Sequence, residues 1–158
     1  MPGLQMDLKA ALRGTLAVSV ALSALGCTTP PSAGTAPSLQ GTTWVLESFQ
    51  SMDDAQGTQR AEPPGAYTLQ FLPEGRVAMR LDCNRGTASW SHTPSADGVS
   101  GAIKFSPVAA TRALCAPPHF GDRLARDLPD IKGYLLRDGK LYLSLRADAG
   151  IYAWRPLP

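Results

Sequence analysis

Gly133-Tyr-Leu-Leu-Arg137 and Lys140-Leu-Tyr-Leu-Ser-Leu145 are two short apolar runs joined by Asp138-Gly139. Aspartate followed by glycine between two such runs is typical of a two-residue β-hairpin, because both turn positions need a positive φ angle. A second turn signal, Asp148-Ala-Gly150, leads into the β-rich segment Ile151-Tyr-Ala-Trp-Arg155. The C-terminal part of the chain is therefore expected to be an antiparallel meander.

The same pattern continues toward the N-terminus. Thr42–Phe49 is rich in β-forming residues, and large apolar residues alternate with polar ones over Tyr67–Phe71. Such alternation predicts a strand with one buried face. After a turn at Pro73-Glu-Gly75, a return strand carries alternate residues on one face: Val77, Met79, Leu81 and Cys83. This parity predicts that Cys83 points toward the core.

Residues 51–65 interrupt the strands with a polar segment. They include Asp53 and Asp54 as well as several prolines and glycines, so we expect an exposed loop. A cation site at the two aspartates is the alternative interpretation.

A single segment has helical periodicity. Phe120, Leu124 and Leu128 lie four residues apart, and Pro129 follows them. This spacing predicts one short amphipathic helix over about residues 119–128, ended by the proline. The whole pattern predicts an α+β fold, a mostly antiparallel β meander curled into a small barrel-like sheet with one short helix.

The N-terminus has the layout of a secretory signal. Basic residues precede the apolar run Leu16–Leu25, which is shorter than the roughly 20 residues that a spanning helix needs. The sequence Ala24-Leu-Gly-Cys27 then resembles the lipobox of bacterial lipoproteins. We predict a signal peptide over residues 1–26 and a lipid on Cys27, which attaches the protein to a membrane. An ordinary signal peptide followed by an incidental cysteine is the alternative.

The remaining chain divides into a tether and one domain. Residues 27–38 carry no charge and no large apolar side chain, which predicts a flexible tether before a domain over residues 39–158. Removal of the signal lowers the formal charge from +2 to +1, since it takes away two basic residues and one acidic residue. So small a charge gives no indication of a nucleic-acid partner.

The chain contains three cysteines, an odd number for an exported protein. If Cys27 is acylated, Cys83 and Cys115 remain as a pair in an oxidising compartment, where disulfides persist. A zinc site that also uses His92 and His119 is the alternative, although Cys-x8-His and Cys-x3-His spacings are unusual for zinc ligands. We therefore predict a Cys83–Cys115 disulfide and no metal.

Motifs that carry chemistry are missing from the sequence. It contains no Gly-x-Ser-x-Gly elbow, no glycine-rich phosphate loop and no His-Glu-x-x-His. Ser91, His92 and Asp97 lie close together in sequence, but the groups of a catalytic triad meet through the fold rather than through adjacency. A surface loop explains these three residues better, so we predict no enzymatic activity and no cofactor.

Five motifs follow one another along the chain: Thr43-Trp-Val-Leu46, Asp82-Cys-Asn-Arg85, Ala110-Thr-Arg-Ala-Leu-Cys115, Gly139-Lys-Leu-Tyr-Leu143 and Trp154-Arg-Pro156. In this order they resemble the META/HslJ domain family over about Leu39 to Pro158. The Cys-Asn pair and the Thr-Arg-x-x-Cys motif are the most specific elements. The chain departs from the family at Asp82, where a glycine is usual, and in the long segment 51–65, which looks like an insertion.

This resemblance implies a barrel-like α+β domain of bacterial envelope proteins with no assigned enzymatic activity. Members of the family are associated with heat shock and novobiocin resistance. We therefore expect a non-enzymatic envelope lipoprotein that supports envelope integrity or stress resistance by binding a partner protein. Thr28 after the lipidated cysteine indicates the periplasmic face of the outer membrane. The alternative function is a carrier that holds a small hydrophobic ligand or lipid in a barrel cavity.

Four polar residues near the cysteines belong to the family motifs: Asn84, Arg85, Thr111 and Arg112. In a structural interpretation, Asn84 adopts a turn or left-handed conformation, while Thr111 and Arg112 bond to nearby carbonyls. In a functional interpretation, the four residues form a polar patch that recognises a carboxylate, a glycan or a partner strand. The tryptophans are expected in the core or at the barrel closure rather than on a ligand platform: Trp44, Trp90 and Trp154.

Overall fold

The computed structural model describes residues 38–53 and 55–158. The predicted signal peptide, the lipidation site Cys27 and nearly all of the tether lie outside the described residues, as does Asp54. The strands, in chain order, are β1 (Thr43–Ser51), β2 (Thr58–Arg60), β3 (Tyr67–Leu72), β4 (Arg76–Leu81), β5 (Asn84–Pro94), β6 (Ser100–Phe105), β7 (Ala109–Ala110), β8 (Ile131–Arg137), β9 (Lys140–Leu145) and β10 (Gly150–Pro156).

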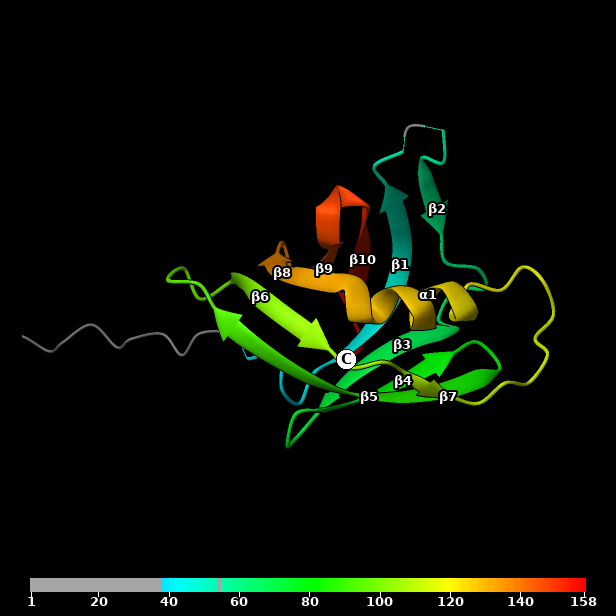
Figure 1. The fold of residues 1–158 in the computed structure, drawn as a ribbon, viewed down its shortest axis with the longest axis horizontal. Helices are drawn as coiled ribbons and strands as arrows, with labels where there is room; N and C mark the ends of the chain where they lie inside the picture. Colours follow the sequence, from blue (N-terminus) through cyan, green and yellow to red (C-terminus); the bar gives the residue numbers. More distant parts are fainter. Residues whose placement is uncertain (1–37, 54) are drawn as a thin grey trace, which may run out of the picture. The chain divides into compact units, whose positions relative to one another are not determined.

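Eight of these strands form a closed antiparallel barrel (Figure 1). The order around the barrel is β1-β3-β4-β5-β6-β8-β9-β10, and β10 pairs back with β1. Register shifts in β1, between Leu46 and Ser48, and in β8, between Ile131 and Gly133, mark bulges that bend a sheet toward closure. The predicted barrel-like meander is confirmed.

Alternating residues from the strands fill the barrel. Tyr67, Leu69 and Phe71 are fully buried, as the period of two in β3 predicts. The predicted core face of β4 is also buried as far as Leu81. The three tryptophans lie in the core, with exposed fractions of 7% or less: Trp44, Trp90 and Trp154. Both the alternation and the placement of the tryptophans are therefore confirmed.

The C-terminal hairpin and the helix also form where they were expected. Asp138 and Gly139 have φ angles of 52° and 71°, as a two-residue turn between β8 and β9 requires. The helix α1 (Gly121–Asp127) continues into the 3-10 turn η1 (Leu128–Asp130) and packs against β4. Its apolar stripe faces the core, because Leu124 is fully buried. No helix within the described residues is long and apolar enough to cross a membrane.

The expectation of a plain loop over residues 51–65 is wrong in part. This segment contains β2, which pairs with Ser48–Gln50 of β1. On the same side of β1, β3 pairs only with Thr43–Val45 and leaves the later residues of the edge free. A free edge of this kind offers backbone hydrogen bonds, and the segment 58–60 uses them.

The expectation that Cys83 faces the core is also wrong. Leu81 pairs directly with Asn84, so Asp82 and Cys83 form the two-residue turn between β4 and β5, and Cys83 is exposed. Asp82 has a φ of 63°, a conformation that aspartate tolerates better than most residues other than glycine. The left-handed residue of this region is therefore Asp82, whereas Asn84 begins a regular strand.

Candidate functional site

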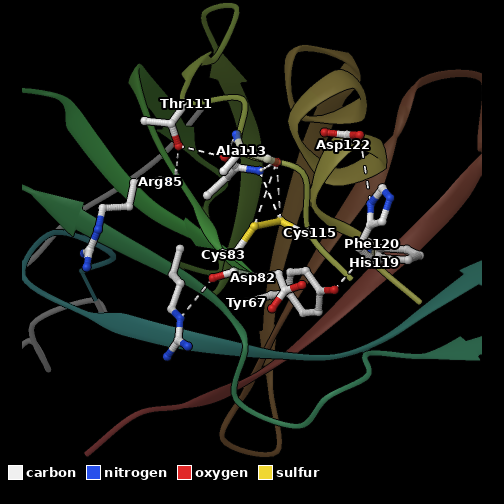
Figure 2. The surroundings of a disulfide bond; sticks show 12 residues. Tyr67, Asp82, Cys83, Arg85, Thr111, Ala113, Cys115, His119, Phe120 and Asp122 are labelled. Atoms are coloured by element: carbon white, nitrogen blue, oxygen red, sulfur yellow. Dashed lines mark hydrogen bonds and ion pairs between the residues drawn. A yellow bond between two sulfur atoms is a disulfide. The ribbon is translucent and has the colours of Figure 1, made fainter. Parts of the chain in front are cut away.

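Cys83 and Cys115 form a disulfide bond, with their Cα atoms 5.7 Å apart (Figure 2). The bond joins the β4–β5 turn to the irregular segment that follows β7. The disulfide confirms the predicted pairing. Because both sulfurs are in this bond, they are not available as the zinc ligands that the alternative requires. The ring of His119 instead lies 3.9 Å from the carboxylate of Asp122. The part of the chain that the structure describes holds no group of three or more His, Cys, Asp or Glu residues that could bind a metal.

Asn84 binds the same irregular segment through both ends of its side-chain amide. Its Nδ2 atom donates to the carbonyl oxygen of Ala113 at 3.0 Å and to Sγ of Cys115 at 3.2 Å. Its Oδ1 atom accepts from the backbone N–H of Ala113 at 2.7 Å and from the hydroxyl of Thr111 at 2.8 Å. Since Asn84 is only 7% exposed, these contacts satisfy a buried polar group.

The segment Thr111–Phe120, here called the clamp loop, is held at both of its ends. At its start, the N–H of Thr111 donates to the carbonyl oxygen of Arg85 at 2.9 Å, and the N–H of Arg85 donates to the Thr111 hydroxyl at 3.0 Å. At its other end, the N–H of Phe120 donates to the hydroxyl of buried Tyr67 at 2.8 Å. With the disulfide in between, these bonds fix the loop against the barrel (Figure 2).

The four predicted motif residues therefore divide into two pairs. Asn84 and Thr111 direct their polar groups inward, although the hydroxyl of Thr111 bonds to a side-chain amide rather than to a backbone carbonyl. Arg85 and Arg112 are exposed, and neither forms an ion pair within residues 38–53 and 55–158. The side chain of Arg112 makes none of the carbonyl hydrogen bonds that we expected within the same ranges.

One large apolar side chain of the clamp loop, that of Leu114, points into solvent. Leu114 has an exposed fraction of 101%, far above the 45% of Met52 and Leu157, the next most exposed large apolar residues described. The cavity beside the disulfide measures about 40 Å³, which is too small for an organic ligand. Leu114 escaped the sequence analysis because a leucine is buried more often than exposed, and no local pattern marks the exception.

An open groove of about 560 Å³ runs between β7 and α1. Its walls include Val108, Ala110 and Arg112 on one side and Ala125 and Arg126 on the other. The sequence analysis did not predict this groove, because it depends on how closely α1 approaches a two-residue strand.

A second open cavity, of about 600 Å³, lies beside the end of α1. Here the guanidinium of Arg123 stacks 4.0 Å from the centre of the Phe49 ring, and its Nε atom lies 3.4 Å from Oδ2 of Asp127. The hydroxyl of Tyr152 donates to the same carboxylate oxygen at 2.6 Å. Burial, and then this hydrogen bond, raise the pKa of Tyr152 far above its ordinary value. These polar groups therefore bond to one another and form a network that connects α1 to the barrel.

The residues of the triad alternative do not assemble. Asp97 accepts hydrogen bonds from the N–H groups of Val99 and Ser100, both at 3.0 Å, and from the Ser100 hydroxyl at 2.7 Å. The bonds from Ser100 lower the pKa of Asp97. An aspartate that accepts hydrogen bonds from the backbone two and three residues later stabilises a turn. The ring of His92 stacks on Trp90 at 5.1 Å. No hydrogen bond connects Ser91, His92 and Asp97 in the described structure.

Asp53 has a similar turn-forming role. It accepts hydrogen bonds from the N–H of Ala55 and from Nε2 of Gln56, both at 3.0 Å, and these bonds lower its pKa. The carboxylate of Asp53 thus bonds to residues of its own loop, and the cation alternative gains no support from this side chain.

Fold and site together define a small closed barrel that presents a loop tied down by a disulfide. Residues 37–155 match the META domain, so the chain belongs to the META domain family. The resemblance carried by the Cys-Asn and Thr-Arg-x-x-Cys motifs is confirmed. A search of curated proteins finds no match. Among solved structures, a DUF4847 family protein from Bacteroides vulgatus ATCC 8482 is similar at 9% identity and a TM-score of 0.49, over 73% of this chain and 92% of that chain.

Proposed function

We propose that this META domain protein is a non-enzymatic, lipid-anchored envelope module that binds a partner protein through the clamp loop. The observation that carries the proposal is Leu114, a fully exposed leucine on a loop that is fixed from both ends. The envelope location and the anchor rest on the lipobox-like sequence that ends at Cys27.

The bonds that hold the loop make it suitable for binding. Ordering a backbone costs about 1–2 kcal/mol per residue, and a loop that becomes ordered only on binding loses that amount from its affinity. The disulfide and the bonds of Asn84 order the clamp loop during folding, so binding does not carry this cost. A leucine held rigidly in water then gains hydrophobic free energy when a partner covers it.

A carrier function is less well supported by the interior of the barrel. Tyr67, Tyr152 and Trp154 are fully buried in it and fill the space that an enclosed ligand would need. A groove of about 380 Å³ beside Trp44 and Leu136 lies at the surface and leaves a bound lipid in contact with water.

In-cell photocrosslinking tests the proposal. A benzophenone amino acid replaces Leu114 in the full-length lipoprotein, and intact cells are irradiated. Leu135 provides a matched control, because it is also a leucine but lies on β8 and is 36% exposed. We expect a discrete protein adduct from position 114 that position 135 does not give. Absence of an adduct at 114, or the same adducts from both positions, would contradict partner binding by the clamp loop.

The carrier alternative is tested with a fluorescent hydrophobic probe, N-phenyl-1-naphthylamine. Its fluorescence should not rise on addition of the purified protein if the barrel is filled. A saturable rise that is lost when Trp44 is replaced by alanine, in a variant that still folds, would favour the carrier instead.

A further inference from the structure

The strand β7 has one free edge. Its pairs are Gly86 with Ala110 and Thr87 with Ala109, and the N–H of Thr111 continues the ladder toward β5. In an antiparallel ladder, both peptide groups of a residue point to the same edge, and successive residues alternate between the two edges. Ala109 and Thr111 therefore face β5.

The residues in between face the opposite way. By the same alternation, the N–H and C=O groups of Val108, Ala110 and Arg112 point away from β5, and β7 has no second strand partner within the described ranges. From Val108 to Arg112 this edge is about 13 Å long, at roughly 3.3 Å per residue. It therefore has the length to pair with four or five residues of an added strand.

The groove beside this edge gives such a strand room. It is the space of about 560 Å³ that separates β7 from α1. Each wall contributes an alanine, Ala110 from β7 and Ala125 from α1, and these small side chains leave space for a peptide backbone. A neighbouring strand needs a spacing of about 4.8 Å, and small side chains permit that approach.

Charge around the edge selects an acidic strand. Arg112 and Arg126 line the groove and form a basic border. Arg112 has no ion pair within residues 38–53 and 55–158, and Nε of Arg126 lies 3.7 Å from a carboxylate oxygen of Asp127. In the groove itself, two arginines outnumber Asp122, the acidic residue among those described as lining it. Carboxylates on a partner would balance this excess of positive charge.

We infer that β7 is a strand-addition site, at which an extended acidic segment of the partner protein pairs with the outward backbone groups of Val108, Ala110 and Arg112. The inference rests on the proposed function and adds the chemistry of the partner and its mode of binding. The partner's strand lies in the β7–α1 groove, and its acidic side chains reach the arginine border. The clamp loop continues from the end of this edge, so Leu114 contacts residues of the partner that flank the added strand.

Replacing Ala110 with proline tests the backbone contact. Ala110→Pro removes the N–H that faces the groove and places the ring where the added strand would lie. The bonds to β5 remain, because Ala109 and Thr111 make them. Ala110→Ser is the matched control, since it keeps both the N–H and a small side chain.

The binding probe is the synthetic peptide acetyl-Glu-Val-Thr-Val-Glu-amide, added to isotope-labelled, disulfide-bonded full-length protein and followed by NMR. We expect the amide signals of Val108, Ala110 and Arg112 to shift on titration. Affinity should fall about tenfold or more in Ala110→Pro and stay within about twofold of the parent in Ala110→Ser. A peptide with lysine in place of glutamate should bind at least about fivefold more weakly, because the arginine border repels it.

Two results would overturn strand addition: no shift of these amides with the acidic peptide, or equal affinity in the proline and serine variants. If Ala110→Pro does not fold, the parent protein decides the question with two peptides, one N-methylated at the odd residues and one at the even residues. If both methylated peptides bind as tightly as the unmethylated peptide, backbone pairing is refuted. An adduct from position 114 that persists in Ala110→Pro cells refutes the strand but leaves the proposed function standing, whereas no adduct in the parent refutes the function itself.

Discussion

Replacing Asn84 with alanine removes the side chain that joins β5 to the clamp loop. Three of its contacts are ordinary hydrogen bonds, two with Ala113 and one with Thr111, at 2.7–3.0 Å. A bond of this kind contributes a net amount of about 1 kcal/mol to stability. Ala113 is exposed, so water can bond to its backbone groups after the substitution and keep the loss near the sum of the three bonds. We expect Asn84→Ala to lower the free energy of unfolding by about 2–3 kcal/mol.

The measurement is urea denaturation of the disulfide-bonded protein at neutral pH, followed by tryptophan fluorescence. The buried indoles report the loss of the barrel core. Thr87→Ala serves as the control, because Thr87 is an exposed polar residue of the same strand whose side chain makes no hydrogen bond within the described residues. The control should change the free energy of unfolding by less than about 0.5 kcal/mol.

The disulfide makes the test sharper. Asn84 and the Cys83–Cys115 bond hold the same loop, so their contributions should not be additive in a double-mutant cycle. Two outcomes would refute the reasoning. The first is an equal change in the free energy of unfolding for Asn84→Ala and Thr87→Ala. The second is a change for Asn84→Ala that stays the same when both cysteines are replaced with serine.

Three further predictions concern the disulfide, the buried tyrosine and the anchor. Replacing Cys83 and Cys115 with serine should lower stability by roughly 3–4 kcal/mol in urea denaturation while the protein stays on the membrane, and unchanged stability would show that the bond does not constrain the unfolded chain. Because the pKa of Tyr152 is raised, its contribution is complete below the unfolded pKa of about 10 and is lost as the pH rises toward the folded value. The urea midpoint should therefore fall above about pH 10 and fall less in Tyr152→Phe, and identical slopes for the two proteins would contradict this assignment. Cys27→Ser should release folded protein from membranes in cell fractionation, and protein that stays with the membrane would refute the lipid anchor.

Local rules were sufficient for the regular elements. The Asp138-Gly139 turn follows from the φ angles that these two residues tolerate. The burial of Tyr67, Leu69 and Phe71 follows from the period of a strand. The helix of α1 follows from apolar residues four apart before Pro129. In each case, the determining interactions lie within a few residues of one another along the chain.

Cys83 shows where such rules stop. Its apolar parity with Leu81 is real, but parity holds only while the strand lasts, and β4 ends before Cys83. The end of the strand is set by pairing between Leu81 and Asn84, with Asp82 in a left-handed conformation. The alternation of residue types carries no information about that end.

The site depends almost entirely on contacts between distant segments. Asn84 meets Thr111, Ala113 and Cys115, which lie 27 to 31 positions further along the chain. The resemblance to the META/HslJ domain family singled out the asparagine together with both cysteines, and the count of cysteines predicted their pairing. The exposure of Leu114 was hidden, because a leucine is buried or exposed according to which segments pack beside it.

By itself, the sequence determined the antiparallel strands, the hairpin, the short helix, the cysteine pair and membership of the META domain family. Only the tertiary structure decided that β10 closes on β1, that β2 and β7 form, and that a free backbone edge faces a groove beside an exposed leucine. The physical reason is the range of the interactions. Turn geometry and side-chain alternation act between near neighbours, whereas barrel closure, free edges and exposure depend on which distant strands take up each hydrogen-bonding edge.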